Sequence, residues 1–523
     1  MSDDHRHVTR AAGINSAATG LCRVLGYVRD AVIANQFGTS WVNSAFCTAF
    51  AIPNTLRRLF GEGAMASSFI PLFAEELHVN GTDSAYKAAR IVLTTLGAFL
   101  SLLGVAVSLV CLVLAAVMPV EPRITLTFLL TAVMMPYSVL VCLTAVGGAM
   151  LNTLGHFSRP ALAPVFLNIA MIAGAWLGGK LAAPPEHQVY VLAVGVLAGG
   201  VLQLRFQVPE LRARGFRFHI VWELRDPFVN CILRLMGPAM IGAGVSQVNI
   251  LVDRFMALSL NERGTAVLTY ADRLVELPLG VFGIALATAV LPAMSFCAAR
   301  NDHKGLVTAL GFALRHVCFI MLPATVGLVL LAEPIVRLLF ERGAFSADST
   351  RATAFALCMY APGLVAFAFV KIIVPVFYAR KDTKTPVTVG VSVLALNIVL
   401  NYILMHTWMR EAGLALSTTI CAYLNVVVLL VVLRRQCGKL GMKEVTISVL
   451  RMAMISGIMG VTVWSVHTWI ADKAGHLSLA AQCLEVGTPL MAGVAMYAVA
   501  CYLLRQRELM DLLAAFFTRH PRT

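Results

Sequence analysis

The chain has 523 residues, of which 59% are hydrophobic and 13% charged, and its formal net charge is +14. Soluble domains carry roughly 25% charged residues, so this composition and a mean hydropathy of +0.80 exclude an ordinary soluble protein. The apolar runs are continuous and do not alternate with polar residues, which excludes a transmembrane β-barrel. We therefore expect an all-α, polytopic membrane protein.

Apolar stretches long enough to cross a hydrocarbon core of about 30 Å as a helix recur along the whole chain. The polar N-terminus and the arginines in the first apolar segment are not typical of a cleavable signal peptide. We expect about fourteen spans, at 15–36, 42–70, 91–118, 124–151, 160–180, 188–208, 228–258, 265–296, 306–332, 349–379, 385–408, 412–433, 447–470 and 484–504.

Basic residues are concentrated in alternate loops between these spans. Under the positive-inside rule, this pattern predicts an even number of spans with both termini in the cytoplasm. The basic surplus is thus explained by topology, and no nucleic-acid partner is expected. The basic segments are 205–226, 379–386, 434–443 and the C-terminal tail, whereas 36–41, 119–123, 181–187 and 471–483 hold few Lys or Arg.

The two halves of the chain are related by an internal repeat. "AMASSFIP" (64–71) aligns without gaps to "ALATAVLP" (285–292), and charged residues precede both segments. We therefore predict two pseudo-symmetric six-helix lobes, at 1–220 and 221–440, followed by a C-terminal helix pair and cytoplasmic tail at 441–523. Related lobes around a shared site are typical of secondary transporters.

Several charges lie inside spans that ought to be apolar. An arginine at the centre of a membrane helix costs roughly 2.5–3.5 kcal/mol on insertion scales, so these side chains must face a polar interior or reach an interface. Some pair locally, since Arg58 and Glu62 are four residues apart and Arg273 and Glu276 three apart. The arginines are Arg23, Arg29, Arg57, Arg58, Arg254 and Arg273, and the acids are Asp30, Glu62, Asp253, Asp272 and Glu276.

Two interpretations of these charges stay open: a purely structural network, or a water-filled cavity between the lobes that binds cargo. The residue types indicate what that cargo would be. Arginine occupies every one of these cationic positions, and its planar fork binds phosphate oxygens in pairs. The residues alone thus predict a transporter or flippase for an anionic, phosphate-bearing amphiphile.

At the same residues the sequence resembles a known family. Its motifs are "CRVLGYVRDAVIANQFG" (22–38), "AIPNTLRRLFGEGAMASSFIPLFAEE" (51–76), "YADRLVELPLGVFGIALATAVLP" (270–292) and "VKIIVPVFYARKDTKTPV" (370–387). They resemble the MurJ/MviN lipid II flippases of the multidrug/oligosaccharidyl-lipid/polysaccharide exporter superfamily. The resemblance implies fourteen helices and the transfer of lipid II, an undecaprenyl-pyrophosphate glycopeptide, from the cytoplasmic to the periplasmic leaflet of the bacterial inner membrane.

The resemblance also implies roles for individual residues. Arg23, Arg29, Arg57 and Arg273 match the family's cavity arginines, with Arg58 beside them, and Glu62 matches its acidic partner. Asp30, Asp272 and Glu276 are expected to support or gate this set. The chain departs from the family pattern at Ser44, where members often have an acid.

Some superfamily members resemble cation-coupled transporters, which implies a Na⁺ site at Asp253, Asn397, Asn401 and Thr418. Oxygen ligands of this kind suit a hard cation, but Asn in a membrane helix also serves as interhelical glue. No other cofactor is expected. The membrane potential is an alternative driving force, because an anion moving outward gains about 2.3 kcal/mol per charge per 100 mV.

Three other functions are alternatives to a lipid II flippase. A drug or ion antiporter of the superfamily should have an acidic cavity, whereas this set of charges is basic. Only the specific motifs distinguish a lipid II flippase from a flippase for another polyprenyl-linked oligosaccharide. A phosphosugar transferase needs carboxylate clusters that bind Mg²⁺, and the cytoplasmic loops are basic, so no enzyme activity is expected. Membrane lipids and cell-wall synthesis proteins are the expected further partners.

Overall fold

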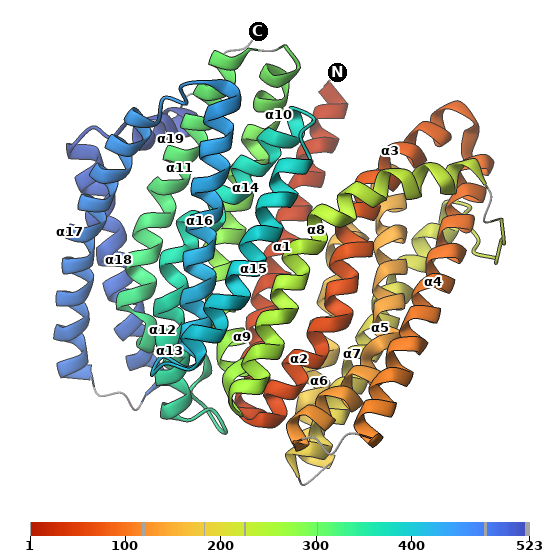
Figure 1. Ribbon diagram of the computed structural model, residues 1–523, viewed down its shortest axis with the longest axis horizontal. Helices are drawn as coiled ribbons and strands as arrows, with labels where there is room; N and C mark the ends of the chain where they lie inside the picture. Colours follow the sequence, from red (N-terminus) through yellow and green to blue (C-terminus); the bar gives the residue numbers. More distant parts are fainter. Residues whose placement is uncertain are drawn as a thin grey trace. The chain divides into compact units, whose positions relative to one another are not determined.

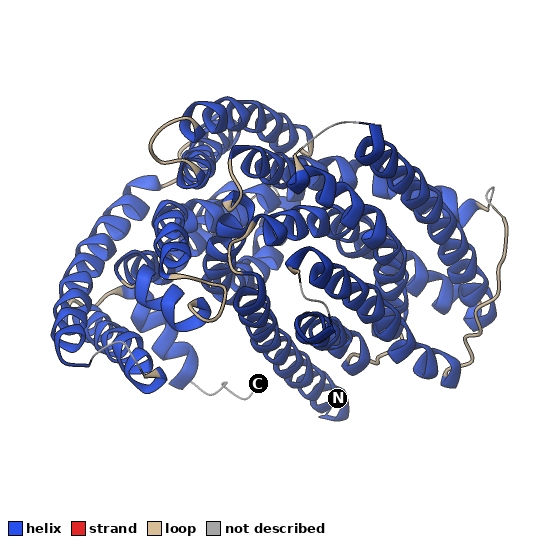
Figure 2. Ribbon diagram, turned by 90° about the horizontal axis from the view of Figure 1, so that it is seen from below, coloured by secondary structure: helices blue, strands red, loops and turns tan. Residues whose placement is uncertain are grey.

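The computed structural model describes residues 2–117, 121–181, 184–223, 226–300, 302–474 and 478–517. Every regular element within these ranges is a helix (Figure 2). Eleven of the helices are long and apolar enough to cross a membrane. The prediction of an all-α, polytopic membrane protein is therefore confirmed, whereas the count of fourteen spans stays a prediction.

The chain divides into two compact units, and the first holds residues up to Ala266 together with Arg342–Phe345. Its long helices lie side by side (Figure 1). In order they are α1 (Ser2–Phe37), α2 (Trp41–Leu56), the π-helical η1 (Arg57–Gly63), α3 (Ala64–Val79), α4 (Gly81–Val117), α5 (Pro122–Thr153), α6 (Ser158–Leu181), α7 (Pro185–Ala213) and α8 (Pro227–Leu260).

The second unit holds Val267–Glu341 and the residues from Ser346 onward. Its elements are α9 (Gly264–Pro278, begun in the first unit), the π-helical η2 (Leu279–Gly283), α10 (Ile284–Ala299), α11 (His303–Leu330), α12 (Ala332–Phe340), α13 (Ala347–Tyr360), the 3₁₀ turn η3 (Ala361–Gly363), α14 (Leu364–Ala379), α15 (Lys384–Met405), α16 (Glu411–Cys437), α17 (Met442–Ala474), α18 (Leu479–Leu503) and α19 (Arg507–Phe517).

All fourteen predicted spans coincide with helical segments, including the three that are not among the eleven strongly apolar helices. These three are α1, the α2–η1–α3 segment and α8, which between them carry most of the intramembrane arginines. Helix α8 packs against α2, α3 and η1 and so belongs to the first unit by its contacts. The lobe boundaries at 220 and 440 stay predictions.

Two short helices, α12 and α19, were not expected from the sequence. Both are too short to cross a membrane and are amphipathic, so they lack the continuous apolar run that marks a span. Glu508 on α19 accepts a 2.7 Å hydrogen bond from the Ser448 hydroxyl of α17 and lies 3.7 Å from the guanidinium of Arg315 on α11. The start of the C-terminal tail is thereby attached to the second unit.

A short loop from the second half of the sequence belongs to the first unit. The backbone N–H of Ala344 donates to the Asn35 carbonyl at 2.9 Å, next to the turn between α1 and α2. Gly343 and Gly38 both have positive φ (57° and 55°), and a methyl group on either would meet the opposite backbone within 2.4 Å. Glycine is therefore required on both sides of this contact.

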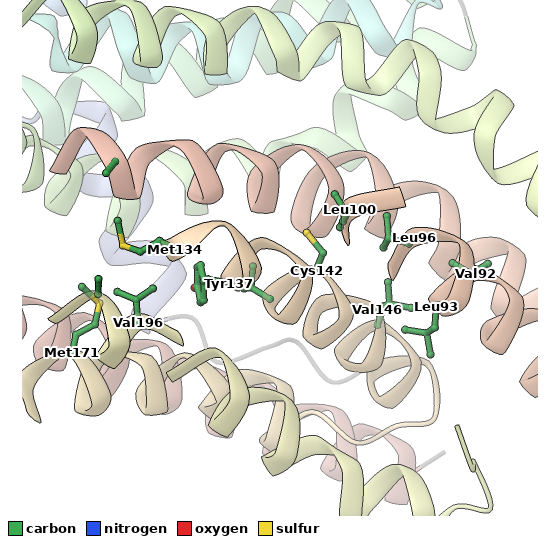
Figure 3. Packing of buried hydrophobic residues seen from close by; sticks show 14 of the residues in the cluster. Val92, Leu93, Leu96, Leu100, Met134, Tyr137, Cys142, Val146, Met171 and Val196 are labelled. Atoms are coloured by element: carbon green, nitrogen blue, oxygen red, sulfur yellow. The ribbon is translucent and has the colours of Figure 1, made fainter. Parts of the chain in front are cut away.

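The apolar core of the first unit contains side chains from all its long helices, and Figure 3 labels those from α4, α5, α6 and α7. Tyr137 on α5 is 1% exposed, and Met134, one turn earlier, is fully buried. The Tyr137 ring lies where Gly200 of α7 leaves space, since a methyl group at Gly200 would approach it to 2.9 Å. Lipid tails are as apolar as these side chains, so close packing of large against small residues stabilises the core.

The closest packing in this unit is between α6 and α7. Each helix presents two glycines four residues apart, Gly174 and Gly178 on α6 and Gly195 and Gly199 on α7. A methyl group added at Gly195 would lie 2.8 Å from the Ala170 carbonyl oxygen. Small residues at this spacing let two membrane helices approach backbone to backbone, so the seam depends on the absence of side chains.

The internal repeat has a counterpart in the backbone. Both copies contain a π-helical segment, η1 at Arg57–Gly63 and η2 at Leu279–Gly283, each followed directly by the repeated helix. In the alignment of 64–71 with 285–292, residues 279–283 correspond to 58–62. π-helical turns are rare, well under 1% of residues, so their occurrence at equivalent positions supports the predicted repeat.

We expect Gly195→Val to destabilise the chain by about 1–3 kcal/mol, because the added atoms overpack the α6–α7 seam. The measurement is the midpoint of thermal unfolding in detergent. Gly487→Ala on α18 is the matched control, since nothing lies within 4 Å of its added methyl group and alanine favours a helix by about 0.5–1 kcal/mol. Equal midpoints for the two variants would contradict the close-packed seam.

Candidate functional site

Arg29, one of the predicted substrate-binding arginines, is buried between α1 and α6. Its Nε and Nη2 donate to one carboxylate oxygen of Asp30 at 2.9 and 2.7 Å. Its Nη1 donates to the amide oxygen of Asn168 at 3.0 Å, and Asn168 in turn donates to the Cys22 carbonyl at 3.2 Å. At least three of the five guanidinium N–H groups are therefore engaged by the protein.

Asn168 was not singled out from the sequence, although a signal was available. It is the only polar side chain between Ala161 and Lys180 in a span that is otherwise apolar or small. Polar residues within membrane spans usually face the bundle interior and have a protein partner. The structure pairs the Asp30 carboxylate with the guanidinium of its neighbour Arg29.

Arg57 and Arg58 begin the π-helical segment η1, and both side chains are half-buried. Arg57 Nε donates to the side-chain oxygen of Asn54 at 2.8 Å, which directs it back along α2. The side chain of Glu62 lies outside the described residues, so its predicted pairing with Arg58 stays a prediction. Arg23 on α1 is also half-buried. Four of the predicted intramembrane arginines thus lie on α1 and η1 of the first unit.

The second unit contributes Arg273 on α9. Its Nη1 lies 3.0 Å from the Glu276 carboxylate, as the spacing predicted. The two side chains are 38% and 40% exposed, so this pair is far more open than the Arg29–Asp30 pair. Asp272 is half-buried beside it. A half-exposed ion pair contributes little to stability, because solvent weakens it.

Arg254 has a different position from the other arginines. Its Nη1 donates to the Thr265 carbonyl at 3.1 Å, and the Thr265 hydroxyl donates back to the Arg254 carbonyl at 3.2 Å. These reciprocal bonds close the turn between α8 and α9. The geometry therefore favours the structural interpretation for this residue.

Ser44, where the family pattern often has an acid, also has a defined partner. Its hydroxyl accepts a hydrogen bond from the backbone N–H of Ala266, in the first turn of α9, at 3.3 Å. One turn later, the hydroxyls of Thr48 and Thr265 are 3.3 Å apart. A helix N-terminus favours a hydrogen-bond acceptor whether it is charged or neutral, so serine fulfils this contact without a carboxylate.

The residues proposed for a Na⁺ site are divided between the two units. Asn397 and Asn401 share one face of α15, as predicted: Asn401 donates to the Asn397 amide oxygen at 3.0 Å, and Asn397 donates to the Ser417 hydroxyl of α16 at 3.1 Å. The Thr418 hydroxyl donates to the Leu414 carbonyl of its own helix at 3.0 Å. The bond to Ser417 supports the role of interhelical glue for Asn397.

Asp253 belongs to the first unit, where its carboxylate accepts a 3.2 Å hydrogen bond from Asn249. Within the described ranges, no three His, Cys, Asp or Glu side chains are arranged to hold a metal ion. The Na⁺ site stays a prediction.

The loop of the fourth motif, 380–383, is fixed by Asp382. Burial raises the pKa of this carboxyl, but hydrogen bonds from the Thr385 backbone, Gln436 and the Thr385 hydroxyl lower it more, so that the pKa lies below its usual value. The bonds measure 3.0, 3.0 and 2.7 Å. Asp382 thereby joins the start of α15 to the end of α16 while charged.

The chain is similar to proteins of one known family. The family model described as "Lipid II flippase MurJ" matches residues 33–483. The "Probable lipid II flippase MurJ" of Vibrio cholerae is 36% identical over 525 residues, covering 98% of each chain. The "Lipid II flippase MurJ" of Burkholderia cenocepacia is 36% identical over 431 residues, covering 80% of this chain and 83% of the relative.

The chain is also similar to solved structures. A structure titled "Lipid II flippase MurJ, inward closed conformation" matches with a TM-score of 0.75 and 26% identity, covering 94% of this chain and 99% of that one. An inward-facing MATE family multidrug transporter of the MOP superfamily matches with a TM-score of 0.67 and 17% identity, covering 82% of this chain and 99% of that one. The second likeness concerns the fold alone.

The Arg29–Asp30 pair allows a test that separates structure from substrate binding. We expect Arg29→Gln and Asp30→Asn each to cost about 3–5 kcal/mol, because each leaves one buried charge uncompensated. The double variant should recover most of that loss. The measurement is a double-mutant cycle on unfolding in detergent, followed by a transport assay of the double variant.

A stable double variant that no longer transports would assign Arg29 a role beyond its ion pair. Additive losses in the cycle would contradict the coupling between the two side chains.

Proposed function

We propose that this chain, which belongs to the lipid II flippase MurJ family, transfers lipid II from the cytoplasmic to the outer leaflet of the bacterial inner membrane by alternating access. The observation that carries the proposal is the 36% identity over 98% of the chain to the probable lipid II flippase of Vibrio cholerae. The family consists of transporters, in agreement with the expectation that the chain is not an enzyme.

The arginines provide guanidinium groups that can bind a pyrophosphate. Guanidinium groups bind phosphate oxygens with paired, charge-assisted hydrogen bonds and stay charged at every accessible pH. We assign the direct phosphate contacts to the half-buried Arg23, Arg57, Arg58 and Arg273. These side chains can reorient toward a ligand, whereas a fully buried ion pair would first have to be broken.

Arg29 has a positioning role in this proposal. Asp30 and Asn168 already hold its guanidinium, so its net effect is to fix α1 against α6 and to keep a cation–carboxylate pair near Arg23. Glu62, Asp272 and Glu276 are proposed to balance the arginines when no substrate is bound. Phosphate would then replace these carboxylates as the partner of the arginines.

The driving force follows from the charge of the cargo. An anion that moves outward through a membrane with a negative interior gains about 2.3 kcal/mol per charge per 100 mV. The chain has no GxxxxGK[ST] phosphate-binding motif, so a potential-assisted carrier is the simplest mechanism. Coupling to Na⁺ through Asp253, Asn397, Asn401 and Thr418 is the second candidate.

The topology proposed from the basic loops places both termini in the cytoplasm. The exposed cationic residues of the loops at 212–217 and 380–384 would then face the leaflet that lipid II leaves. Proteins of cell-wall synthesis remain the proposed further partners on that side. The drug-antiporter alternative is not favoured, because the matches to MATE family transporters are only 15–18% identical.

The first test is exposure of lipid II on the outer leaflet of bacteria depleted of their own flippase. We expect the parent chain to restore exposure, and Arg57→Ala or Arg273→Ala to abolish most of it at equal membrane levels, because each removes a phosphate ligand. Arg300→Ala is the matched control: it removes the same charge from an exposed position at the end of α10.

A well-folded parent chain that restores no exposure would overturn the assignment of lipid II as substrate. Exposure that persists in both arginine variants would keep the function and make these two arginines structural.

A further inference from the structure

The connection between α7 and α8 exposes a group of large apolar side chains. In this connection, residues 216–223 form an irregular segment, here called the α7–α8 segment. Phe218, Ile220 and Trp222 are 57%, 74% and 63% exposed. Three such side chains within five residues form a larger apolar surface than a water-facing loop usually shows.

The α7–α8 segment is held firmly, so this exposure is not that of a loose loop. It lies beside the first turns of α4 (Figure 1). Arg90 Nε donates to the Arg217 carbonyl at 2.9 Å, and the backbone N–H of Val221 donates to the Thr94 hydroxyl at 3.3 Å. The buried Phe216 ring meets the Tyr86 ring edge-on, with centroids 5.5 Å apart.

Two further contacts fasten the ends of the segment. The Tyr86 hydroxyl donates to the Arg214 carbonyl at 2.7 Å, just before the segment begins. Lys87 and Glu223 form an ion pair at 2.9 Å at its other end. Tyr86 and Lys87 lie on α4, as do Arg90 and Thr94, so the segment is attached to one helix along about two turns.

Helix α4 also shows at which depth the segment lies. Its 37 residues would span about 55 Å, well beyond the roughly 30 Å of a hydrocarbon core. All its charged residues, Asp83, Lys87 and Arg90, precede Ile91, and none follows up to Val117. The contacts at Arg90 and Thr94 therefore hold the segment where the polar end of α4 meets its apolar span.

The side chains around the segment indicate what covers it. Trp and other aromatic residues are enriched at the membrane–water interface, where an apolar ring and a polar edge are both satisfied. Arg212, Arg217 and His219 are exposed beside the apolar group. Lys and Arg near the cytoplasmic surface attract anionic lipids by about 1 kcal/mol each. Apolar and basic residues together at this depth fit a lipid surface better than a protein partner.

We propose that the α7–α8 segment is an interfacial anchor. Phe218, Ile220 and Trp222 enter the boundary between headgroups and acyl chains of the cytoplasmic leaflet, and Arg212 and Arg217 bind the phosphates of anionic phospholipids. Because the segment is attached to α4, the anchor fixes the depth of α4 in the bilayer. This role does not depend on which lipid the chain transports.

The test uses the full chain in nanodiscs and the fluorescence of Trp222, taken as the difference between the parent and Trp222→Phe. We expect this component to be quenched by phospholipids brominated near the glycerol end of the acyl chains, and to resist the water-soluble quencher acrylamide. Trp41→Phe is the control, because Trp41 packs against the core of the first unit and its component should resist both quenchers. Trp222→Phe should leave the thermal unfolding midpoint unchanged, because the Trp222 side chain is largely exposed.

The basic residues are tested with the same signal. Brominated phosphatidylglycerol should quench Trp222 more than brominated phosphatidylcholine at equal content, and the double variant Arg212→Gln/Arg217→Gln should lose this difference. Quenching by acrylamide alone would show that the segment faces water and overturn the anchor. Protection from both quenchers would show a covering protein surface, including a second copy of the chain, and would overturn it equally. Equal quenching by the two lipids would overturn the assignment of anionic headgroups.

Discussion

A guanidinium buried between apolar helices has to be neutralised and hydrogen-bonded by the protein itself, because neither bulk water nor lipid can do so. Arg29 meets this requirement with one carboxylate from its own helix and one amide from α6. That contact orients α1 against α6, and α6 is in turn fixed to α7 by the glycine seam at Gly174 and Gly195. The half-buried Arg23 lies on the same helix as Arg29, so its position is fixed by these contacts, as the proposed binding of a mobile headgroup requires.

Arginines that occur in similar sequence motifs differ in burial, and we propose different roles for them on that basis. Arg29 and Arg273 occur in similar short motifs, each beside an acid, yet the Arg29 side chain is 9% exposed and that of Arg273 is 38% exposed. Arg254 is engaged by the turn that it closes. A ligand competes readily with a half-exposed pair, since solvent already weakens it, and poorly with a buried one. The proposed division into positioning arginines and phosphate-binding arginines is based on this difference in side-chain exposure.

Much of the fold could be predicted from the sequence because its signals are local and strong. Continuous apolar runs mark the helices, and the i,i+3 spacing of Arg273 and Glu276 is enough to predict their ion pair. The partner of Arg29 could not be predicted in this way: Asn168 is 139 residues away, and only the packing of α1 on α6 brings the two together. Helix α19 was missed for another reason, since its amphipathic pattern is too short to resemble a span. The family motifs supplied the substrate class, which the residues alone had narrowed only to an anionic amphiphile.

The two π-helical segments indicate what the internal repeat has preserved. Their sequences, "RRLFGEG" and "LGVFG", have little in common, and the first carries the arginines whereas the second is wholly apolar. A π-helical turn adds a residue to the helix and so rotates everything beyond it by about 100° relative to an uninterrupted α-helix. The two copies of the repeat therefore differ in the charge of the π-helical segment, but they share the change in helix register. π-helical turns occur frequently at functional sites, which supports the proposal that Arg57 and Arg58, at the start of η1, contact the substrate.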